Sequence, residues 1–339
     1  CPVQLSGIGV AVANTPYGPF VDPIGKPLIN NSGDDIDPTI FIDDDGQAYL
    51  YWGNPQPYYV KMNSDMISYS GKITTQTVKP DKYVEGPWLT KRNGLYYLLY
   101  AANGIPENLA YATSTSPLGP WTYRGVIMPT QGASFTNHCG IIDFKGNSYL
   151  FYHNGALPGG GGYKRSVCVE QFAYNADGTF PTINMTTQGV TTPVINLNPY
   201  NRVEAETMAY ESGIETNRDD KVGMYVDSIN TGNYIKVRSV DFGEKGAAMF
   251  EASVANSGKE ARIELHIDRL NGTLVSTLPI NYTEGKWKTE KAVVTNCSGV
   301  HDLYLVFRGE SGNKTLFKFD YWRMTPKTST RTLIGINVH

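Results

Sequence analysis

The chain has 339 residues with a net charge of −3, and both signs of charge are interspersed along it. This balance excludes the strongly basic surface that binding to nucleic acids or anionic membranes requires. No apolar run approaches the roughly 18 residues of a membrane span, so we expect a soluble protein with neither of these partners. Tyrosine is abundant, with 23 residues, and charged residues make up only 18%. Such a composition favours short strands and polar aromatic surfaces of the kind that stack on sugars.

The four cysteines form no CxxC pair, which argues against a zinc site or a disulfide scaffold. Six N-x-S/T sequons are compatible with secretion, and we expect an extracellular protein; they lie at Asn30, Asn184, Asn271, Asn281, Asn296 and Asn313. Because the chain opens on Cys1, we expect a processed or partial product.

Three similar segments recur in the first half of the chain. Each places a turn glycine before an aromatic strand: GQAYLYW (46–52), GLYYLLYA (94–101) and GNSYLFYH (146–153). A spacing of about 50 residues is typical of propeller blades. The alternative is a β-sandwich with coincidental hairpins.

A second motif recurs out of phase with the first. VAVANTPYGPF (10–20) is similar to AYATSTSPLGPW (110–121), but too little chain precedes the first copy to complete its blade. We therefore expect a propeller that lacks its first blade or more, over residues 1–195.

The pattern changes near residue 190. A linker rich in proline and asparagine (191–201) precedes about ten short alternating strands, which predict a β-sandwich over residues 200–326. Residues 327–339 read as an appended tail.

Six aspartates lie in DDIDPTIFIDDDG (34–46). Asp37 precedes a predicted strand, where propeller strands face the central channel. Asp43, Asp44 and Asp45 read as a solvated hairpin turn before Gly46. The spacing does not match an EF-hand loop.

Glu85 in YVEGPWL stands among aromatic residues. Partial desolvation would raise its pKa, as a general acid requires. The alternative is a surface glutamate before a turn. Trp88 and Trp52 either stack on sugars or pack within blades, and His153 reads as a packed or hydrogen-bonded histidine.

The ordered motifs DPTIFIDDDG, EGPWLTKRNGLYYLLYA, TNHCGIIDF and GYKRSVCVEQF resemble glycoside hydrolase family 43, a family of five-bladed propellers. The segments GIGVAVANTPYGPFVDPIGKPL and INLNPYNRVEAET are most similar to its arabinoxylan arabinofuranohydrolases. VEAET and LFKFDYWRM resemble carbohydrate-binding module family 6. Together these motifs cover residues 7–326.

The resemblance implies an inverting hydrolase. Glu85 would be the general acid and Asp37 the residue that tunes its pKa. His138 would support a hydrated calcium ion or a water network, and Arg165 would contact the sugar. The aspartate that acts as general base in this family has no matching context here. We therefore expect either a fragment or a separate N-terminal chain that completes the propeller, because an incomplete ring exposes strand edges.

In the sandwich, the resemblance implies a structural calcium ion and a sugar-binding cleft. Glu204, Glu206 and Asp320 would hold the calcium, and Tyr225, Trp287 and Asn313 would line the cleft. Trp287 alternatively belongs to the core.

The resemblance thus implies an enzyme that removes α-L-arabinofuranosyl side groups from arabinoxylan or its xylo-oligosaccharides. One alternative is a β-xylosidase or an enzyme with both activities. An alternative of another class is a xylan-binding protein or fragment without catalysis.

Overall fold

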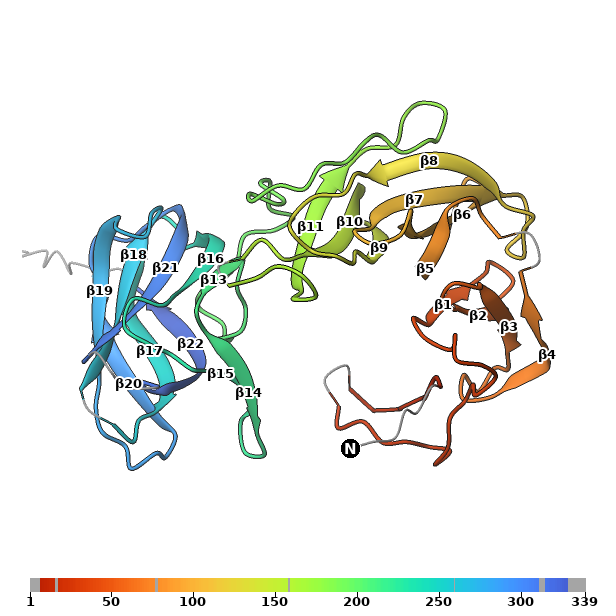
Figure 1. Ribbon diagram of the computed structural model, residues 1–339. Coiled ribbons are helices and arrows are strands. Elements are labelled where there is room, and N and C mark those ends of the chain that lie inside the picture. Colours follow the sequence, from red (N-terminus) through yellow and green to blue (C-terminus); the bar gives the residue numbers. More distant parts are fainter. Residues whose placement is uncertain are drawn as a thin grey trace, which may run out of the picture. The chain divides into compact units, whose positions relative to one another are not determined.

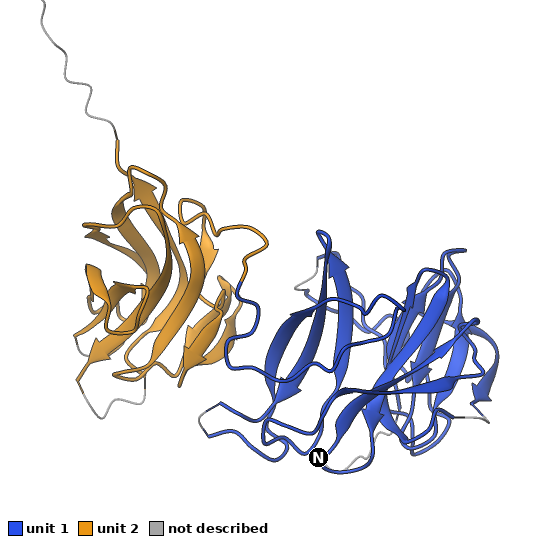
Figure 2. Cartoon of the chain, turned by 90° about the horizontal axis from the view of Figure 1, so that it is seen from above, with its two compact units in different colours: residues 1–191 blue, residues 192–339 orange. Residues whose placement is uncertain are grey.

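The computed structural model describes residues 7–15, 18–76, 79–157, 159–258, 260–310 and 315–328, and these contain strands and no helix. The all-β prediction is confirmed. The chain forms two compact units, residues 1–191 and 192–339, coloured separately in Figure 2. In the described part of the chain there is accordingly no helix that could span a membrane.

Unit 1 contains three antiparallel sheets whose strands pair in chain order. The first sheet consists of β1 (Thr39–Ile42), β2 (Ala48–Trp52), β3 (Tyr58–Met62) and β4 (Tyr69–Thr75). The second consists of β5 (Tyr83–Arg92), β6 (Leu95–Ala102), β7 (Asn108–Ser114) and β8 (Thr122–Met128). The third consists of β9 (Cys139–Phe144), β10 (Asn147–Asn154) and β11 (Ser166–Phe172).

The repeat found in the sequence corresponds to β2, β6 and β10, the second strand of each sheet. β6 is apolar on both sides because the second sheet packs against both neighbouring sheets; Leu98, Leu99 and Tyr100 are all at most 1% exposed. In β10 one face stays open, and Phe151 on it is 43% exposed. The three sheets follow one another around an arc in Figure 1, as blades do in a propeller.

Neighbouring sheets pack through their first strands. β1 and β2 contact β5, and β5 and β6 contact β9. One aromatic core fills the first of these interfaces, including Phe41, Tyr51 and Tyr96. A second core fills the next, including Tyr97 and Tyr152. This packing brings the beginnings of β1, β5 and β9 together on the inner side of the arc (Figure 1).

The aspartates of residues 34–46 have separate roles. The prediction that Asp43 is solvated is wrong. Its side chain is 10% exposed and accepts hydrogen bonds from Lys91 Nζ at 2.7 Å and Tyr96 Oη at 2.6 Å. It therefore ties the β1–β2 turn to the second sheet. Asp44 is exposed as predicted, with 85% of its side chain accessible, although it also pairs with Lys91 at 2.9 Å.

Trp52 belongs to the core, so packing within a blade is the correct one of its two predicted roles. Its side chain is fully buried, and its Nε1 donates to Asp35 Oδ1 at 2.8 Å. Asp35 is 1% exposed and also accepts from the backbone N–H groups of Asn31 and Ser32. These contacts anchor the segment that leads to Asp37.

Unit 2 is a sandwich of two antiparallel sheets. One has the order β14 (Glu215–Asp219), β15 (Gly223–Asp227), β22 (Lys318–Pro326), β17 (Ala247–Ala255) and β20 (Lys288–Val293), with β12 (Val203–Glu204) also paired to β22. The other has the order β13 (Tyr210–Ser212), β16 (Tyr234–Asp241), β21 (Val300–Gly309), β18 (Ala261–Ile267) and β19 (Thr273–Ile280). A buried core between them includes Phe250, Leu305 and Trp322.

Replacing Asp43 by alanine should destabilise unit 1, because Tyr96 would lose its acceptor and Lys91 would keep only the exposed Asp44. We expect the thermal midpoint of this unit to fall by roughly 2–4 °C in differential scanning calorimetry.

Asp44→Ala is the matched control, since Asp44 shares Lys91 but is exposed, and an exposed ion pair contributes little. Equal effects of the two substitutions would contradict the structural role of Asp43.

Candidate active site

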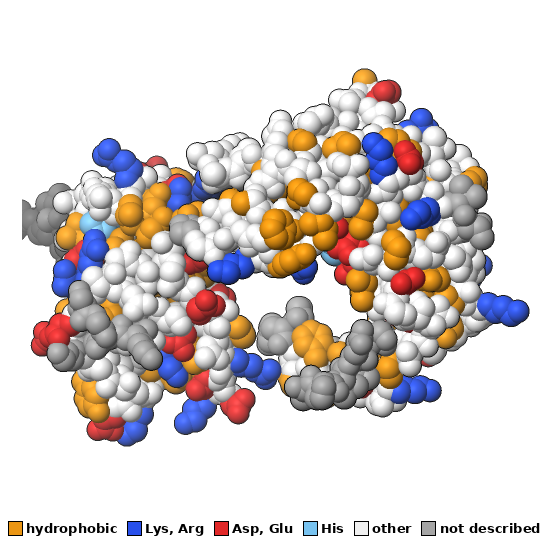
Figure 3. Space-filling view, in the orientation of Figure 1, with side chains coloured by type: hydrophobic (Ala, Val, Ile, Leu, Met, Phe, Trp, Pro, Cys, Tyr) orange, Lys and Arg blue, Asp and Glu red, His pale blue; other side chains and the backbone are white. Residues whose placement is uncertain are grey.

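Three predicted site residues converge where β1, β5 and β9 begin. Asp37 precedes β1, Glu85 lies near the start of β5, and His138 precedes β9. One ligand atom of each lies within 4.8 Å of the others. Figure 3 shows acidic and histidine atoms together on the inner side of the arc of unit 1. Glu85 and His138, which are 53 positions apart in sequence, thus form one polar centre with Asp37.

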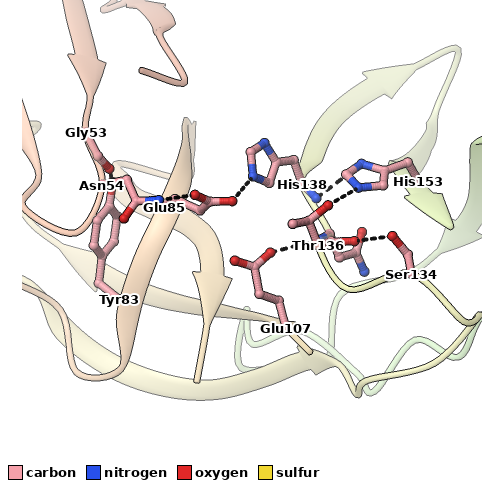
Figure 4. A network of polar contacts seen from close by, with 10 residues as sticks. Gly53, Asn54, Tyr83, Glu85, Glu107, Ser134, Thr136, His138 and His153 are labelled. Atoms are coloured by element: carbon pink, nitrogen blue, oxygen red, sulfur yellow. Dashed lines mark hydrogen bonds and ion pairs between the residues drawn. The ribbon is translucent and has the colours of Figure 1, made fainter. Parts of the chain in front are cut away.

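Glu85 is held by two side chains from different sheets. Its Oε1 lies 2.9 Å from His138 Nε2, and its Oε2 accepts a hydrogen bond from the Asn54 amide, as Figure 4 shows. The bond to His138 lowers the pKa of Glu85 and outweighs the effect of burial. The predicted rise in the Glu85 pKa is therefore wrong for this arrangement, because a cationic partner stabilises the ionised carboxylate.

Burial alone would lower the pKa of His138, but Glu85, Asp37 and Glu107 raise it above the ordinary value. Gly86 lets the imidazole approach, since a Cβ at this position would lie 2.9 Å from ring atoms of His138. The φ of Gly86, +58°, is also one that favours glycine. The glycine of the EGPW motif is thus a steric requirement of the Glu85–His138 pair.

Asp37 has a strained backbone and an unsatisfied carboxylate oxygen. Its φ is 57°, which is uncommon for a residue other than glycine and is often found at functional sites. Its Oδ2 is buried without a hydrogen-bond partner. Burial raises the pKa of Asp37, and the charge of Glu85 adds to this, whereas His138, Gly86 N–H and Arg165 act in the opposite direction.

Glu107 is a member of the site that the sequence analysis missed. It precedes β7, is 3% exposed, and accepts a hydrogen bond from the backbone N–H of Asn137 at 2.9 Å through Oε2. Burial and the nearby charge of Glu85 raise its pKa to about 7. Glu107 therefore fixes the backbone next to His138 and supplies a carboxyl group that is readily protonated (Figure 4).

Asn54 was also missed, because nothing in GNPQP marks its amide as a partner of Glu85. Glu107 follows Pro106 immediately before a strand. A search for any acidic residue within two positions of a proline at a strand start would have included it with Asp37 and Glu85.

Arg165 is exposed, and its positive charge acts on Asp37 and His153. Burial lowers the pKa of His153 to about 4, and its ring lies against Thr136 Oγ1 at 3.3 Å. His153 is hydrogen-bonded, as predicted. Trp88 packs partly buried against the core between the second and third sheets. Its role in substrate binding, like that of Arg165, stays a prediction.

Asp37, Glu85 and His138 are, among the described residues, the one set of three such side chains whose ligand atoms cluster closely enough to hold a metal ion. Calcium prefers six to eight oxygen ligands, whereas this set offers two carboxylates and one imidazole. The set therefore does not fit a directly coordinated calcium ion. A hydrated ion whose waters contact these side chains is compatible with it.

The predicted calcium ligands of unit 2 surround an arginine. Arg202 binds Glu204 Oε1 at 2.7 Å and Asp320 Oδ1 at 3.0 Å. Glu206 Oε2 is buried without a hydrogen-bond partner, and burial, with Glu204 and Asp320 nearby, raises the pKa of Glu206. The three carboxylates do not form one of the described sets whose ligand atoms lie close enough together to hold a metal ion, and the Arg202 guanidinium already balances the charge of two of them. A calcium ion at this place stays a prediction.

Two of the predicted cleft residues of unit 2 lie together. The rings of Tyr225 and Trp287 are 5.4 Å apart in an edge-to-face arrangement, and Lys318 Nζ lies 5.0 Å from the Tyr225 ring. Tyr225 is 3% exposed, so Trp287 offers more of its ring to a ligand. Asn313 lies outside the described residues.

Comparison with known families agrees with this geometry. Residues 3–180 match the family described as "Glycosyl hydrolases family 43", and residues 204–326 match "Carbohydrate binding module (family 6)". The chain belongs to glycoside hydrolase family 43. The recognition made from the sequence motifs is confirmed for both units.

Relatives in this family include an arabinoxylan arabinofuranohydrolase of Bacillus subtilis, 37% identical over 95% of this chain and 71% of its own length. A xylosidase/arabinosidase of Bacteroides ovatus is 33% identical over 52% of this chain and 65% of its own length. A crystal structure of a family 43 arabinoxylan arabinofuranohydrolase from Bacillus subtilis in complex with cellotetraose superposes with a TM-score of 0.84. The two chains are 36% identical, and the matched region spans 95% of this chain and 74% of the other.

Glu107→Gln should make stability less dependent on pH. The folded protein holds a proton on Glu107 up to about pH 7, whereas an unfolded glutamate loses it near pH 4.3, so stability falls as pH rises through this window. Glutamine keeps the acceptor for Asn137 and carries no charge. We expect the variant to match the parent near pH 4 and to exceed its thermal midpoint by at least about 3 °C at pH 8.

Glu215→Gln is the control, because Glu215 is exposed on β14. A midpoint difference between Glu107→Gln and the parent that stays constant from pH 4 to pH 8 would contradict the protonated state of Glu107.

Proposed function

We propose that this protein removes α-L-arabinofuranosyl side groups from arabinoxylan with inversion. The observation that carries this proposal is the centre of Glu85, Asp37 and His138 at the inner strand ends of a family 43 unit. The similarity to arabinoxylan arabinofuranohydrolases over nearly the whole chain supports the substrate class.

In the proposed mechanism, Glu85 protonates the leaving glycosidic oxygen. Asp37 lies beside it with a negative charge that disfavours the loss of its proton. Arg165 binds hydroxyl groups of the arabinose. A water attacks from the opposite face, and inverting enzymes keep acid and base about 6.5–9.5 Å apart to admit it.

We propose that the general base comes from a segment that packs on the open face of the third sheet. Apolar side chains on this face are exposed: Ile142, Phe144, Phe151 and Val167 are between 43% and 85% accessible. Their registers place them on one side of β9, β10 and β11. A further sheet, in a separate N-terminal chain, would cover them.

Unit 2 would hold the enzyme on its polymeric substrate. Trp287 and Tyr225 provide the aromatic surface, and Asn313 is proposed to bond sugar hydroxyls. Because arabinoxylan is a polymer that acts as substrate outside cells, we propose an extracellular enzyme.

Two other functions remain as candidates. The xylosidase/arabinosidase relative supports β-xylosidase activity, since the same carboxylates serve both reactions. Release of xylose rather than arabinose from arabinoxylan would favour it. A xylan-binding protein without catalysis would retain binding and release neither sugar.

Glu85→Gln should lower arabinose release from arabinoxylan about 10²- to 10⁴-fold, the usual contribution of a general acid. The loss should be much smaller with 4-nitrophenyl α-L-arabinofuranoside, because nitrophenolate leaves without protonation. Release of arabinose and of nitrophenol would be measured for both substrates.

The exposed Glu215→Gln variant serves as control for this comparison. A near-normal rate of Glu85→Gln on arabinoxylan, or an equal loss on both substrates, would contradict the assignment of Glu85 as the acid.

We also propose that calcium binds at Glu204, Glu206 and Asp320. Chelation with EDTA should then lower the thermal midpoint of unit 2, and added calcium should restore it. The midpoint of Glu206→Gln should not respond to either treatment. An unchanged midpoint in the parent protein would refute this calcium site.

A further inference from the structure

The strand registers of unit 1 show which loops border the polar centre. Ala101, near the end of β6, pairs with Glu85. Tyr152, near the end of β10, pairs with Cys139, which follows His138. Because antiparallel neighbours run in opposite directions, the loop after the second strand of each sheet emerges beside the start of the first strand. These loops therefore lie at the end of the sheets where the polar centre is.

Two of these three loops supply residues to the polar centre itself. The loop after β2 provides Asn54, whose amide bonds Glu85. The loop after β6 provides Glu107, which is buried and whose charge interacts with that of Glu85. The third loop, after β10, ends at Arg165, whose charge acts on the polar centre. By position and by this charge, the third loop also borders the centre.

The third loop is fixed beside the segment that leads into β9. The Phe135 N–H donates to Gly162 O at 2.8 Å, and Gly162 also forms a parallel bridge with Ser134. Ser134 is buried, and its Oγ lies 3.3 Å from Gly162 O. Gly160 lets the loop turn tightly, because a Cβ there would clash with the carbonyl oxygen of Gly155. The glycine run thus positions the backbone on either side of it.

Two aromatic side chains are exposed on this fixed backbone. Phe135 is 45% and Tyr163 is 62% exposed, and their rings meet edge to face with centres 5.3 Å apart. Among the residues that the structure describes, the buried cores of unit 1 include neither ring. Phe135 lies three residues before His138, at most about 11 Å along the chain, and Tyr163 lies two residues before Arg165. Exposed apolar groups beside a polar centre are typical of a ligand-binding surface.

The arrangement of the two rings fits a pyranose sugar. Their planes are 82° apart, so a ligand can lie on the face of one ring with the other ring at its side. Xylose has all its hydroxyl groups equatorial, which leaves apolar C–H groups on both faces of its ring. The Tyr163 hydroxyl adds a donor and an acceptor for the hydroxyl groups at the edge of the sugar.

We propose that Phe135 and Tyr163 form a platform for a xylose residue of the main chain, next to the residue that bears the arabinose. The inference rests on the proposed function for the identity of the polysaccharide. Contacts with this part of the substrate, which does not react, would orient the scissile bond at Glu85. The platform would thus make the protein select arabinose on xylan over arabinose on a small alcohol.

The test compares two substrates that carry the same sugar. One is an arabinofuranosyl-substituted xylotriose, and the other is methyl α-L-arabinofuranoside, which has no main chain. Arabinose release gives kcat and KM for each. Tyr163→Ala should raise KM for the oligosaccharide about tenfold, the loss expected for roughly 60 Å² of apolar contact, with little change in kcat. Its kcat/KM for the methyl glycoside should match that of the parent.

Phe135→Ala should show the same division between the two substrates, and Tyr163→Phe, which keeps the ring, should retain a KM close to that of the parent. Tyr282→Ala is the matched control, because Tyr282 is 63% exposed and lies in unit 2. Thermal midpoints establish that the variants are folded. An unchanged KM for the oligosaccharide in folded Tyr163→Ala, or an equal loss with both substrates, would overturn the platform.

The outcome is separable from that of the proposed function. A parent protein that releases arabinose from neither substrate would refute the proposed function, and binding of xylotriose then tests the platform by itself. In a Trp287→Ala background, which reduces binding by unit 2, Tyr163→Ala should weaken the affinity for xylotriose about tenfold. Equal affinity with and without Tyr163→Ala would overturn the platform.

Discussion

Compensation of buried negative charge is the constraint on which the candidate active site depends. Asp37, Glu85 and Glu107 bring three carboxyl groups to one place, and His138 is the cation that bonds one of them directly. Like charges at short range cannot all ionise at low cost. The site therefore divides its protons unequally: the pKa values of Asp37 and Glu107 are raised and that of Glu85 is lowered. This division requires the three first strands to meet, and Gly86 to leave room for the imidazole.

The same constraint connects the resting site to catalysis. A general acid must carry a proton, yet His138 stabilises the ionised form of Glu85. A sugar oxygen that replaces His138 beside Glu85 would remove the largest influence that lowers its pKa. Burial and the charge of Asp37 would then favour the protonated acid. In this account, substrate binding itself prepares Glu85 for proton transfer, and the protonated Glu107 keeps the neighbouring backbone in place.

The sequence predicted those features that depend on short stretches of chain. Glycine-led aromatic strands identified β2, β6 and β10, because strand alternation and turn chemistry are local. The resemblance pointed to Asp37, Glu85 and His138 through motifs that surround each residue. Asp43 was misjudged because its partners Lys91 and Tyr96 are 48 and 53 residues away, on another sheet. Asn54 was missed for the same reason, since the packing of two sheets brings it to Glu85. Glu107 lies near Glu85 because β5, β6 and β7 pair within one sheet, and this pairing is not readable from either segment alone. The fall in the Glu85 pKa likewise follows from a contact between two sheets.

The stereochemistry of the released sugar tests the central claim most directly. Proton NMR spectra recorded in the first minutes of arabinoxylan hydrolysis distinguish the two anomers of free arabinofuranose before they interconvert. Direct attack by water, with Glu85 as acid, predicts that β-L-arabinofuranose appears first. Initial release of the α anomer would mean retention through a covalent intermediate, and would contradict the mechanism proposed for this site.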